Sequence, residues 1–264
     1  MTAVDIQRQM HRMKLPKISL LTIRRILKSE GLNGRIRVKK PLLTKRHKKL
    51  RLKFAKKYRH WTSSDWRKVI FSDETQIRRI GSSGKLYCWR FVKEPVSERT
   101  SKPTVKKDGG DFMIWSCFGY NGVGWAAKIN GGINAELYKE VLEGEFLWSI
   151  EHCLQKRDQQ NMVFQQDNAP CHKARSIMSW FDDNGIQLLD DPPQSPDLNP
   201  IENLWRILKH KLHQDGTINT AEKLWNQFEK EWENISGDIC KKLIDSMPKR
   251  LAAVIKAKGG PTKY

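Results

Sequence analysis

Three acidic residues lie next to the ends of apolar or proline-marked segments, and their chemistry suits metal-assisted reactions. Asp73 ends the run KVIFSD, Asp167 follows the apolar residues of NMVFQQDNAPCH, and Glu202 begins a helix after the loop PPQSPDLNP. Thirty-four residues separate Asp167 from Glu202. Hard cations such as Mg²⁺ bind carboxylate oxygens, and two such ions can act together on a phosphodiester. These three residues are therefore our candidate metal ligands.

Each of these carboxylates also has an ordinary structural explanation. The segment NPIE at residues 199–202 has the pattern of a helix N-cap, a proline at the first helical position and a glutamate at the third. Glu202 could then simply bond back to the amide of Asn199. Asp167 could form an Asx turn, and Asp73 could cap a strand end. The occurrence of all three at the ends of core elements favours metal binding over three unrelated local roles.

The composition points to a polyanionic partner. The chain has 264 residues, with 49 Lys and Arg against 29 Asp and Glu, and a formal net charge of +20. This balance favours nucleic acid over a membrane surface, with a ribosomal-type basic protein as the alternative. Ten tryptophans and 38% hydrophobic residues argue against a disordered basic tail. No apolar run approaches about 18 residues, so we expect no transmembrane helix and no membrane partner.

The five cysteines are scattered and form no CxxC pair. This pattern indicates reduced thiols in a cytosolic or nuclear protein and disfavours structural zinc. Cys171 and His172 are adjacent in the sequence, but no cysteine or histidine pair around them has the ligand spacing of a zinc site.

Residues 1–32 predict two short helices, with Thr2 and Ser19 as their N-caps. A helix, a turn and a cationic helix form the arrangement that enters a major groove, so we interpret this segment as part of a helix-turn-helix module. A plain amphipathic hairpin is the alternative, because no third helix is predicted beneath the pair. The side chains expected to contact DNA are Arg24, Arg25 and Lys28.

Residues 33–60 predict a basic linker whose lysines and arginines lie along phosphates. The same charges could serve as a nuclear-localisation patch, and a solvated charged helix is the third interpretation. Leu50, Phe54 and Tyr58 recur every four residues, which predicts a helix in the second half. The candidate phosphate contacts are Arg35, Arg37, Lys39, Lys40, Lys45 and Arg46.

Residues 61–264 predict a mixed α/β domain. The runs KVIFSD and TQIRRI suggest neighbouring strands, KLYCWR another, and residues 91–111 a long loop. The runs FMIWSCFGY and GVGWAAKIN predict a hairpin across Asn121-Gly122. A long helix, strand MVFQQ, helix KARSIMSWFDDNG and strand IQLLD follow, and the remainder is helical. This order fits a ribonuclease-H-like core, a mixed sheet flanked by helices, in which Asp73 and Asp167 lie side by side and Glu202 faces them.

The motifs FSDET, FQQDNAPCH and SPDLNPIENLW resemble the Tc1 branch of the Tc1/mariner DNA transposases, as do KKPLLTKRHKKLRLKFAKK and the terminal VIKAKGGPTKY. The resemblance covers nearly the whole chain and includes the 34-residue spacing. It implies that Asp73, Asp167 and Glu202 are catalytic ligands of two Mg²⁺ ions, for which Mn²⁺ can substitute. Asn168 and His172 match motif positions with supporting roles.

The resemblance also implies an activity and its partners. The expected reaction is cut-and-paste cleavage of double-stranded DNA at inverted-repeat ends, followed by strand transfer into TA sites. A homodimer bridging two ends and a nuclear location are implied as well. Ala169 and Cys171 depart from the family, whose members often have an acidic residue and a lysine at these positions.

A further departure concerns the region before the catalytic domain. Family members have two helix-turn-helix units, and the first unit and the opening helix of the second have no counterpart here. We therefore expect a partial module at 1–32, the linker at 33–60, the catalytic domain at 61–264 and incomplete end recognition. The alternatives are a non-catalytic DNA-binding protein derived from a transposable element and, more distantly, a nuclease acting on RNA–DNA hybrids. The complete set of three carboxylates favours the enzyme.

Overall fold

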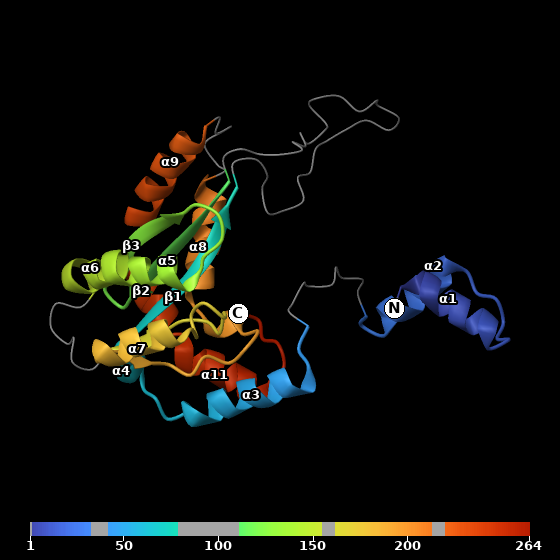
Figure 1. The fold of residues 1–264 in the computed structure, drawn as a ribbon. Helices are drawn as coiled ribbons and strands as arrows, with labels where there is room; N and C mark the ends of the chain where they lie inside the picture. The colour runs from blue at the N-terminus through green and yellow to red at the C-terminus, as the bar shows by residue number, and fades with distance from the viewer. Residues whose placement is uncertain (1, 33–41, 79–110, 155–161, 213–219) are drawn as a thin grey trace. The chain divides into compact units, whose positions relative to one another are not determined.

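The computed structural model describes residues 2–32, 42–78, 111–154, 162–212 and 220–264 (Figure 1). Its contacts divide the chain into two compact units, Met1–Pro41 and Leu42–Tyr264. Across the described ranges, no helix has the length and apolar character needed to cross a bilayer. Each unit is considered by itself below.

The small unit contains two helices, α1 (Ala3–Arg12) and α2 (Leu20–Ser29), as the sequence predicts. Thr2 and Asp5 form a complete capping box, in which the threonine hydroxyl accepts from the Asp5 amide at 3.2 Å and the Asp5 carboxylate accepts from the Thr2 amide at 2.8 Å. The hydroxyl of Ser19 caps α2 by accepting from the amide of Thr22 at 3.1 Å. Both predicted N-caps are therefore confirmed.

The outer surface of α2 is cationic. Ile23 is buried against α1, whereas Arg24, Arg25 and Lys28 are exposed. The helix is followed by Gly31, whose φ of +73° is a left-handed conformation that glycine adopts without a steric penalty. The predicted cationic helix is thus formed, with its charges free to meet a ligand.

The larger unit is built on a five-stranded sheet of order β3-β2-β1-β4-β5. Strand β1 pairs antiparallel with β2 and parallel with β4, which confirms the predicted mixed sheet. The strands are β1 (Val69–Ile77), β2 (Phe112–Gly119), β3 (Gly122–Ile129), β4 (Val163–Gln165) and β5 (Gln187–Leu188).

One strand prediction was wrong. The segments KVIFSD and TQIRRI were expected to be two neighbouring strands, but β1 runs through both, from Val69 to Ile77, so Asp73 lies within it. The reason is tertiary pairing, because the ladder with β2 continues from Asp73 opposite Ser116 to Ile77 opposite Phe112. The β2–β3 hairpin is confirmed, with Gly119 opposite Gly122. The expected strand KLYCWR and residues 91–110 of the expected loop lie outside the described residues.

Helices cover both faces of this sheet (Figure 1). The long helix predicted before β4 is confirmed as a continuous run in which α-helical and π-helical turns alternate. Its parts are α5 (Ala135–Val141), η2 (Leu142–Phe146), α6 (Leu147–Ser149) and η3 (Ile150–Leu154). The remaining helices are α3 (Lys45–Lys57), α4 (Ser63–Trp66), α7 (Arg175–Asp183), η5 (Pro196–Leu198), α8 (Ile201–Leu212), α9 (Ala221–Glu233), α10 (Gly237–Ile244) and α11 (Met247–Lys256).

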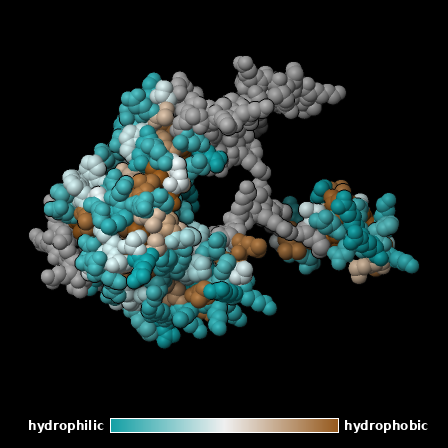
Figure 2. Space-filling model, in the orientation of Figure 1, coloured by the Kyte–Doolittle hydropathy of each residue, from teal (hydrophilic) through white to brown (hydrophobic). Residues whose placement is uncertain are grey.

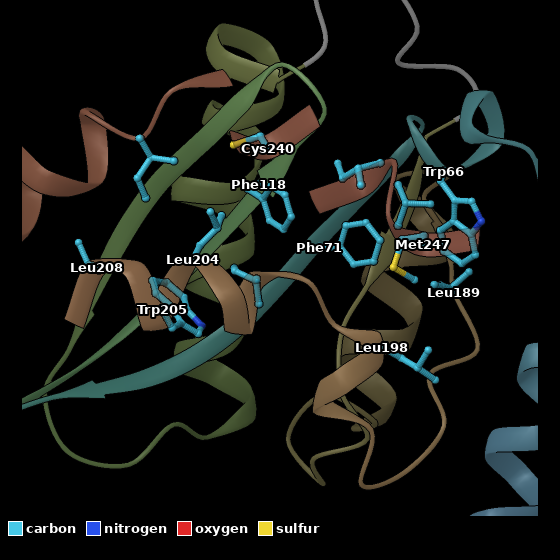
Figure 3. Close-up of a cluster of buried hydrophobic side chains, with 14 of the residues drawn as sticks. Trp66, Phe71, Phe118, Leu189, Leu198, Leu204, Trp205, Leu208, Cys240 and Met247 are labelled. Atoms are coloured by element: carbon cyan, nitrogen blue, oxygen red, sulfur yellow. The ribbon is translucent and has the colours of Figure 1, made fainter. Parts of the chain in front are cut away.

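Alternation along the strands divides the core into two hydrophobic clusters, one on each face of the sheet. Ile70 joins the cluster that includes α5 and α7, whereas the next residue, Phe71, joins the cluster that includes α8 to α11. Figure 3 shows Phe71 and Phe118 among side chains of this second cluster, including Leu204. Because Asp73 lies two residues after Phe71, it shares the face that packs against α8.

Helix α3, which the sequence placed in a basic linker, belongs to the larger compact unit. Phe54, Ala55 and Tyr58 are buried, and α3 packs against α11. The two compact units divide between Pro41 and Leu42, because the apolar face of α3 packs within the larger unit. Lys45 and Arg46 are exposed, and hydrophilic residues dominate much of the face seen in Figure 2. Arg35, Arg37, Lys39 and Lys40 lie outside the described residues.

Candidate active site

Strand register brings two of the predicted carboxylates together. In the parallel pair β1–β4, Phe71 lies opposite Gln165. Asp73 and Asp167 each follow this pair by two residues, with Asp73 inside β1 and Asp167 just beyond the end of β4. Because the two strands are parallel neighbours, this register sets the two residues side by side. The apolar run before Asp167 forms the strand, and the chain leaves the sheet after Gln165, so the carboxylate stands just beyond the strand end.

The third carboxylate is carried by the second residue of α8. The amide nitrogen Nδ2 of Asn199 donates to the carbonyl of Ser72 at 3.0 Å, which ties the chain before Glu202 to the residue before Asp73. The backbone amide of Asn199 donates to Pro196 O at 3.2 Å. That amide is the group that a capping box would give to Glu202, so the capping alternative is not realised here.

The pKa values support a close approach of the three groups. Burial raises the pKa of Asp73 well above its ordinary value, and the charges of Glu202, Glu74 and Asp167 raise it further. Burial also raises the pKa of Glu202, against the opposing effect of Lys209. Like charges have this effect only when they lie near one another. Asp73 is therefore the carboxylate most in need of a compensating positive charge.

His172 holds Asp167 from the buried side. Its ring is 2% exposed, with Nδ1 at 2.7 Å from Asp167 Oδ1 and Nε2 at 3.3 Å from Glu74 Oε1. Burial lowers the pKa of His172, but the contacts with Asp167 and Glu74 outweigh it and raise the pKa to about 10. Both ring nitrogens thus face carboxylates, and the side chain is an imidazolium that orients Asp167.

The Asx turn considered for Asp167 is also present. The amide of Ala169 donates to Asp167 Oδ1 at 2.8 Å. Burial would raise the pKa of Asp167, but the bonds from His172 and Ala169 lower it below the ordinary value. Both bonds engage Oδ1, and the side chain is 52% exposed. The other oxygen, Oδ2, takes part in neither bond, so the turn is compatible with ligand binding.

Sequence reasoning missed two charged residues beside the triad. Asp191 accepts from Gln165 Nε2 at 3.1 Å, and its carbonyl accepts from Asn168 Nδ2 at 2.7 Å. Burial raises the pKa of Asp191 to about 7. Lys209 follows Glu202 by two helical turns and donates to Thr75 Oγ1 at 2.5 Å. The seven-residue spacing of Glu202 and Lys209 was the available signal for one shared helix face.

The donor set suits a hard cation. Asp73, Asp167 and Glu202 offer carboxylate oxygens. Burial is the main cause of the raised pKa of Asp73, and the neighbouring carboxylates add a repulsion that a divalent ion would relieve. Within the part of the chain that the structure describes, no three acidic, histidine or cysteine side chains already stand close enough to hold a metal ion. The strand register and the bond from Asn199 to Ser72 O bring the candidate ligands to one edge of the sheet, and closing them around an ion requires side-chain movement.

Comparison with known families identifies both parts of the chain. Residues 68–225 match the family described as DDE superfamily endonuclease, and residues 1–60 match a helix-turn-helix family described as Transposase. The chain is 39% identical to the Transposable element Tc1 transposase of Caenorhabditis elegans, covering 100% of this chain and 94% of the relative. It is 36% identical to the Transposable element Tcb1 transposase of Caenorhabditis briggsae, with the same coverage.

Solved structures show the same fold. A pre-cleavage Mos1 transpososome matches with a TM-score of 0.82 at 18% identity, over 100% of this chain and 76% of that chain. The catalytic domain of Mos1 mariner transposase matches with a TM-score of 0.66 at 18% identity, over 86% of this chain and 100% of that chain. The predicted ribonuclease-H-like core with a helix-turn-helix segment before it is thereby confirmed. The chain belongs to the Tc1/mariner family of transposases and carries its DDE endonuclease domain.

Proposed function

We propose that Asp73, Asp167 and Glu202 are the metal-binding catalytic residues of a cut-and-paste DNA transposase. The observation that carries this proposal is the parallel register of β1 and β4, which sets Asp73 beside Asp167. The bond from Asn199 to Ser72 O adds Glu202 to the same edge. Three oxygen donors with mutual repulsion form the kind of site that divalent cations bind.

The cofactor we propose is a pair of Mg²⁺ ions, which Mn²⁺ can replace. When bound, such ions acidify an attacking water and stabilise the departing 3′ oxygen. The protein's own residues supply positioning: His172 fixes Asp167 Oδ1, and its ring lies 4.1 Å from that of Tyr138. Asn168 supports the same loop through its bond to Asp191 O. Because phosphoryl transfer depends mainly on positioning and charge neutralisation, the site needs no serine or cysteine nucleophile.

The proposed substrate is double-stranded DNA, and the proposed reaction has two steps. Water breaks a phosphodiester at each transposon end and frees a 3′-OH. That hydroxyl then attacks a phosphodiester at a TA target, forming one bond while another is broken. Exposed Arg24, Arg25, Lys28, Lys45 and Arg46 support phosphate contact, and we assign Arg35, Arg37, Lys39 and Lys40 the same role. A homodimer holding two inverted-repeat ends in the nucleus completes the proposal.

The test is strand transfer with pre-cut DNA. A duplex with a free 3′-OH, taken from the genomic repeat beside the coding sequence, is incubated with a TA-containing plasmid and Mg²⁺ or Mn²⁺. Asp167→Asn should reduce joining by at least about 10²-fold, since a charge-stabilising group at the reacting centre is lost. Asp190→Asn is the control, because Asp190 is 70% exposed and outside the triad.

The outcomes distinguish a catalytic transposase from a non-catalytic DNA-binding protein. Joining by the wild type and by Asp190→Asn, but not by Asp167→Asn, supports the enzyme. Equal joining by Asp167→Asn contradicts the metal assignment. DNA binding without cleavage or joining by the wild type would favour the non-catalytic DNA-binding protein.

A further inference from the structure

A buried arginine in α3 forms hydrogen bonds with the loop that leads to Glu202. Arg51 is 1% exposed and Asp197 is 8% exposed. The guanidinium donates from Nη1 to Oδ1 at 2.6 Å and from Nη2 to Oδ2 at 2.7 Å, a two-point contact that lysine does not reproduce. Asp197 lies in η5, the short turn that precedes α8. The ion pair between Arg51 and Asp197 therefore joins α3 to the loop before α8.

The C-terminal segment closes the same network. Arg51 Nε donates to Gly259 O at 3.0 Å, and Nη2 donates to Gly260 O at 3.1 Å. The hydroxyl of Thr262 donates to Asp197 Oδ2 at 2.7 Å. Arg51 thus donates both to Asp197 and to the C-terminal segment. Because that segment also donates to Asp197, it fixes the orientation of both side chains.

A second arginine holds the loop on the other side of Glu202. Arg250 in α11 donates to the backbone carbonyl of Asp197 at 2.8 Å and to Asn203 Oδ1 at 2.6 Å. Asn203 is the residue directly after Glu202. Together with the bond from Asn199 to Ser72 O at 3.0 Å, these contacts anchor the chain on both sides of the carboxylate.

We infer that Arg51 and Asp197 are positioning residues that set Glu202 for metal binding, an inference that rests on the proposed function. Neither side chain belongs to the triad. A buried ion pair is by itself weak evidence for stability, because hydrophobic residues of similar volume often serve as well. Its location, between two packed segments and the loop that carries one ligand, gives it a geometric role. Loss of partners that orient ligands typically weakens metal binding about 10–100-fold.

The experiment measures Mn²⁺ binding to the full chain by calorimetry, without DNA. Arg51→Lys keeps the charge and loses the two-point contact, and we expect about tenfold weaker binding. Glu202→Gln should also weaken binding. If Arg51 acts through Glu202, the double variant should bind Mn²⁺ no more weakly than Glu202→Gln alone, because the orientation of a lost ligand no longer matters.

A second variant perturbs the network without removing a polar group. Gly259 has φ +80°, and a Cβ added there would lie 2.0 Å from Lys48 O, so Gly259→Ala must shift the tail away from α3. Gly132→Ala is the matched control, because its Cβ meets nothing within 4 Å. Gly259→Ala should weaken Mn²⁺ binding in the same direction as Arg51→Lys, and Gly132→Ala should leave it unchanged.

Thermal melting distinguishes positioning from a general loss of stability. Ile177→Val, in the core on the opposite face of the sheet, should lower the melting temperature without changing Mn²⁺ affinity. The inference is overturned if Glu202→Gln weakens binding while folded Arg51→Lys and Gly259→Ala bind like the wild type. It is also overturned if the effect of Arg51→Lys persists fully in the Glu202→Gln background. If Arg51→Lys does not fold, Gly259→Ala decides by the same cycle. Unchanged binding by Glu202→Gln would instead refute the proposed triad.

Discussion

Replacing Asp197 with asparagine removes the negative charge that faces Arg51 and keeps the shape of the side chain. The guanidinium would remain buried, at 1% exposure, with a neutral amide in place of its partner. The new amide nitrogen would also meet donors from Arg51 or Thr262, since Asp197 accepts bonds from both. Leaving a buried charge without its partner costs about 3–5 kcal/mol. Because the amide oxygen can still accept one bond, we expect a loss at the lower end, about 3 kcal/mol.

The comparison variant is Asp190→Asn. Asp190 pairs with Lys57, but these side chains are 70% and 53% exposed. A pair in solvent contributes about 0–1 kcal/mol, so this substitution should change the free energy of unfolding by less than about 1 kcal/mol. Unfolding in urea, followed by tryptophan fluorescence, measures both variants in the full chain. All ten tryptophans lie beyond residue 60, so the signal comes from the larger unit.

The pH dependence of the Asp197→Asn effect provides a second check. Burial would raise the pKa of Asp197, but the bonds from Arg51 and Thr262 outweigh it and lower the pKa below the ordinary value. A lowered pKa contributes stability above the unfolded value, near 4, and this contribution is lost as the pH falls through the folded pKa. The difference in free energy of unfolding between the wild type and Asp197→Asn should therefore become smaller as the pH falls. A difference below about 1 kcal/mol at pH 7, or a gap that widens in acid, would refute the reasoning.

Two further predictions concern His172 and the basic face of α3. The pKa of His172 is raised from 6.5 to about 10, so its contribution to stability is complete below pH 6.5 and is lost as the pH rises toward 10. Over this pH range the free energy of unfolding of the metal-free wild type should fall by on the order of 2 kcal/mol, a value reduced for solvent screening because Asp167 is half exposed. The free energy of unfolding of His172→Gln should not fall in this way. Identical pH profiles of the two proteins in urea unfolding would contradict an imidazolium. Affinity for duplex DNA should fall steeply between about 50 and 200 mM salt, and replacing Lys45 and Arg46 with alanine should reduce the logarithmic slope by about 2. An unchanged slope in a titration by fluorescence anisotropy would show that these side chains do not contact phosphate.

Features fixed by short-range chemistry were predictable from the sequence. The caps of α1 and α2 depend on Thr2 and Ser19 bonding to amides three residues away, and both bonds form. The β2–β3 hairpin depends on two alternating runs around a tight turn, and it forms as well. Strand β1 was misjudged because the polar residues 72–76 interrupt the apolar pattern, whereas the ladder with β2 extends the strand regardless of that pattern.

Features that depend on distant partners were not predictable. The spacing of Leu50, Phe54 and Tyr58 indicated a helix, but the surrounding lysines and arginines suggested a linker. Arg51 looks like any other cation in that run. It is buried because distant groups accept its hydrogen bonds: Asp197, 146 positions along the chain, and the carbonyls of Gly259 and Gly260. The pattern of charges in a sequence therefore indicates the kind of molecule that the protein binds better than it indicates which charged side chain is buried.

The candidate site shows the same division. Asp73, Asp167 and Glu202 were found because each stands near a recognisable turn or strand signal. Lys209 and Asp191 were not singled out, and the structure brings them to the site through α8 and through the bond with Gln165. Sequence reasoning thus supplied the candidate ligands, and the fold supplied the residues that surround them.

The site also explains how a strongly basic chain can keep carboxylates together. The charges that raise the pKa of Asp73 would drive a flexible site apart. Here each candidate ligand is restrained by a contact outside the triad: His172 contacts Asp167, Asn199 bonds to the strand of Asp73, and Arg250 bonds to the residue after Glu202. These contacts hold the backbone around each carboxylate in place, so that binding a cation requires movement of the side chains only.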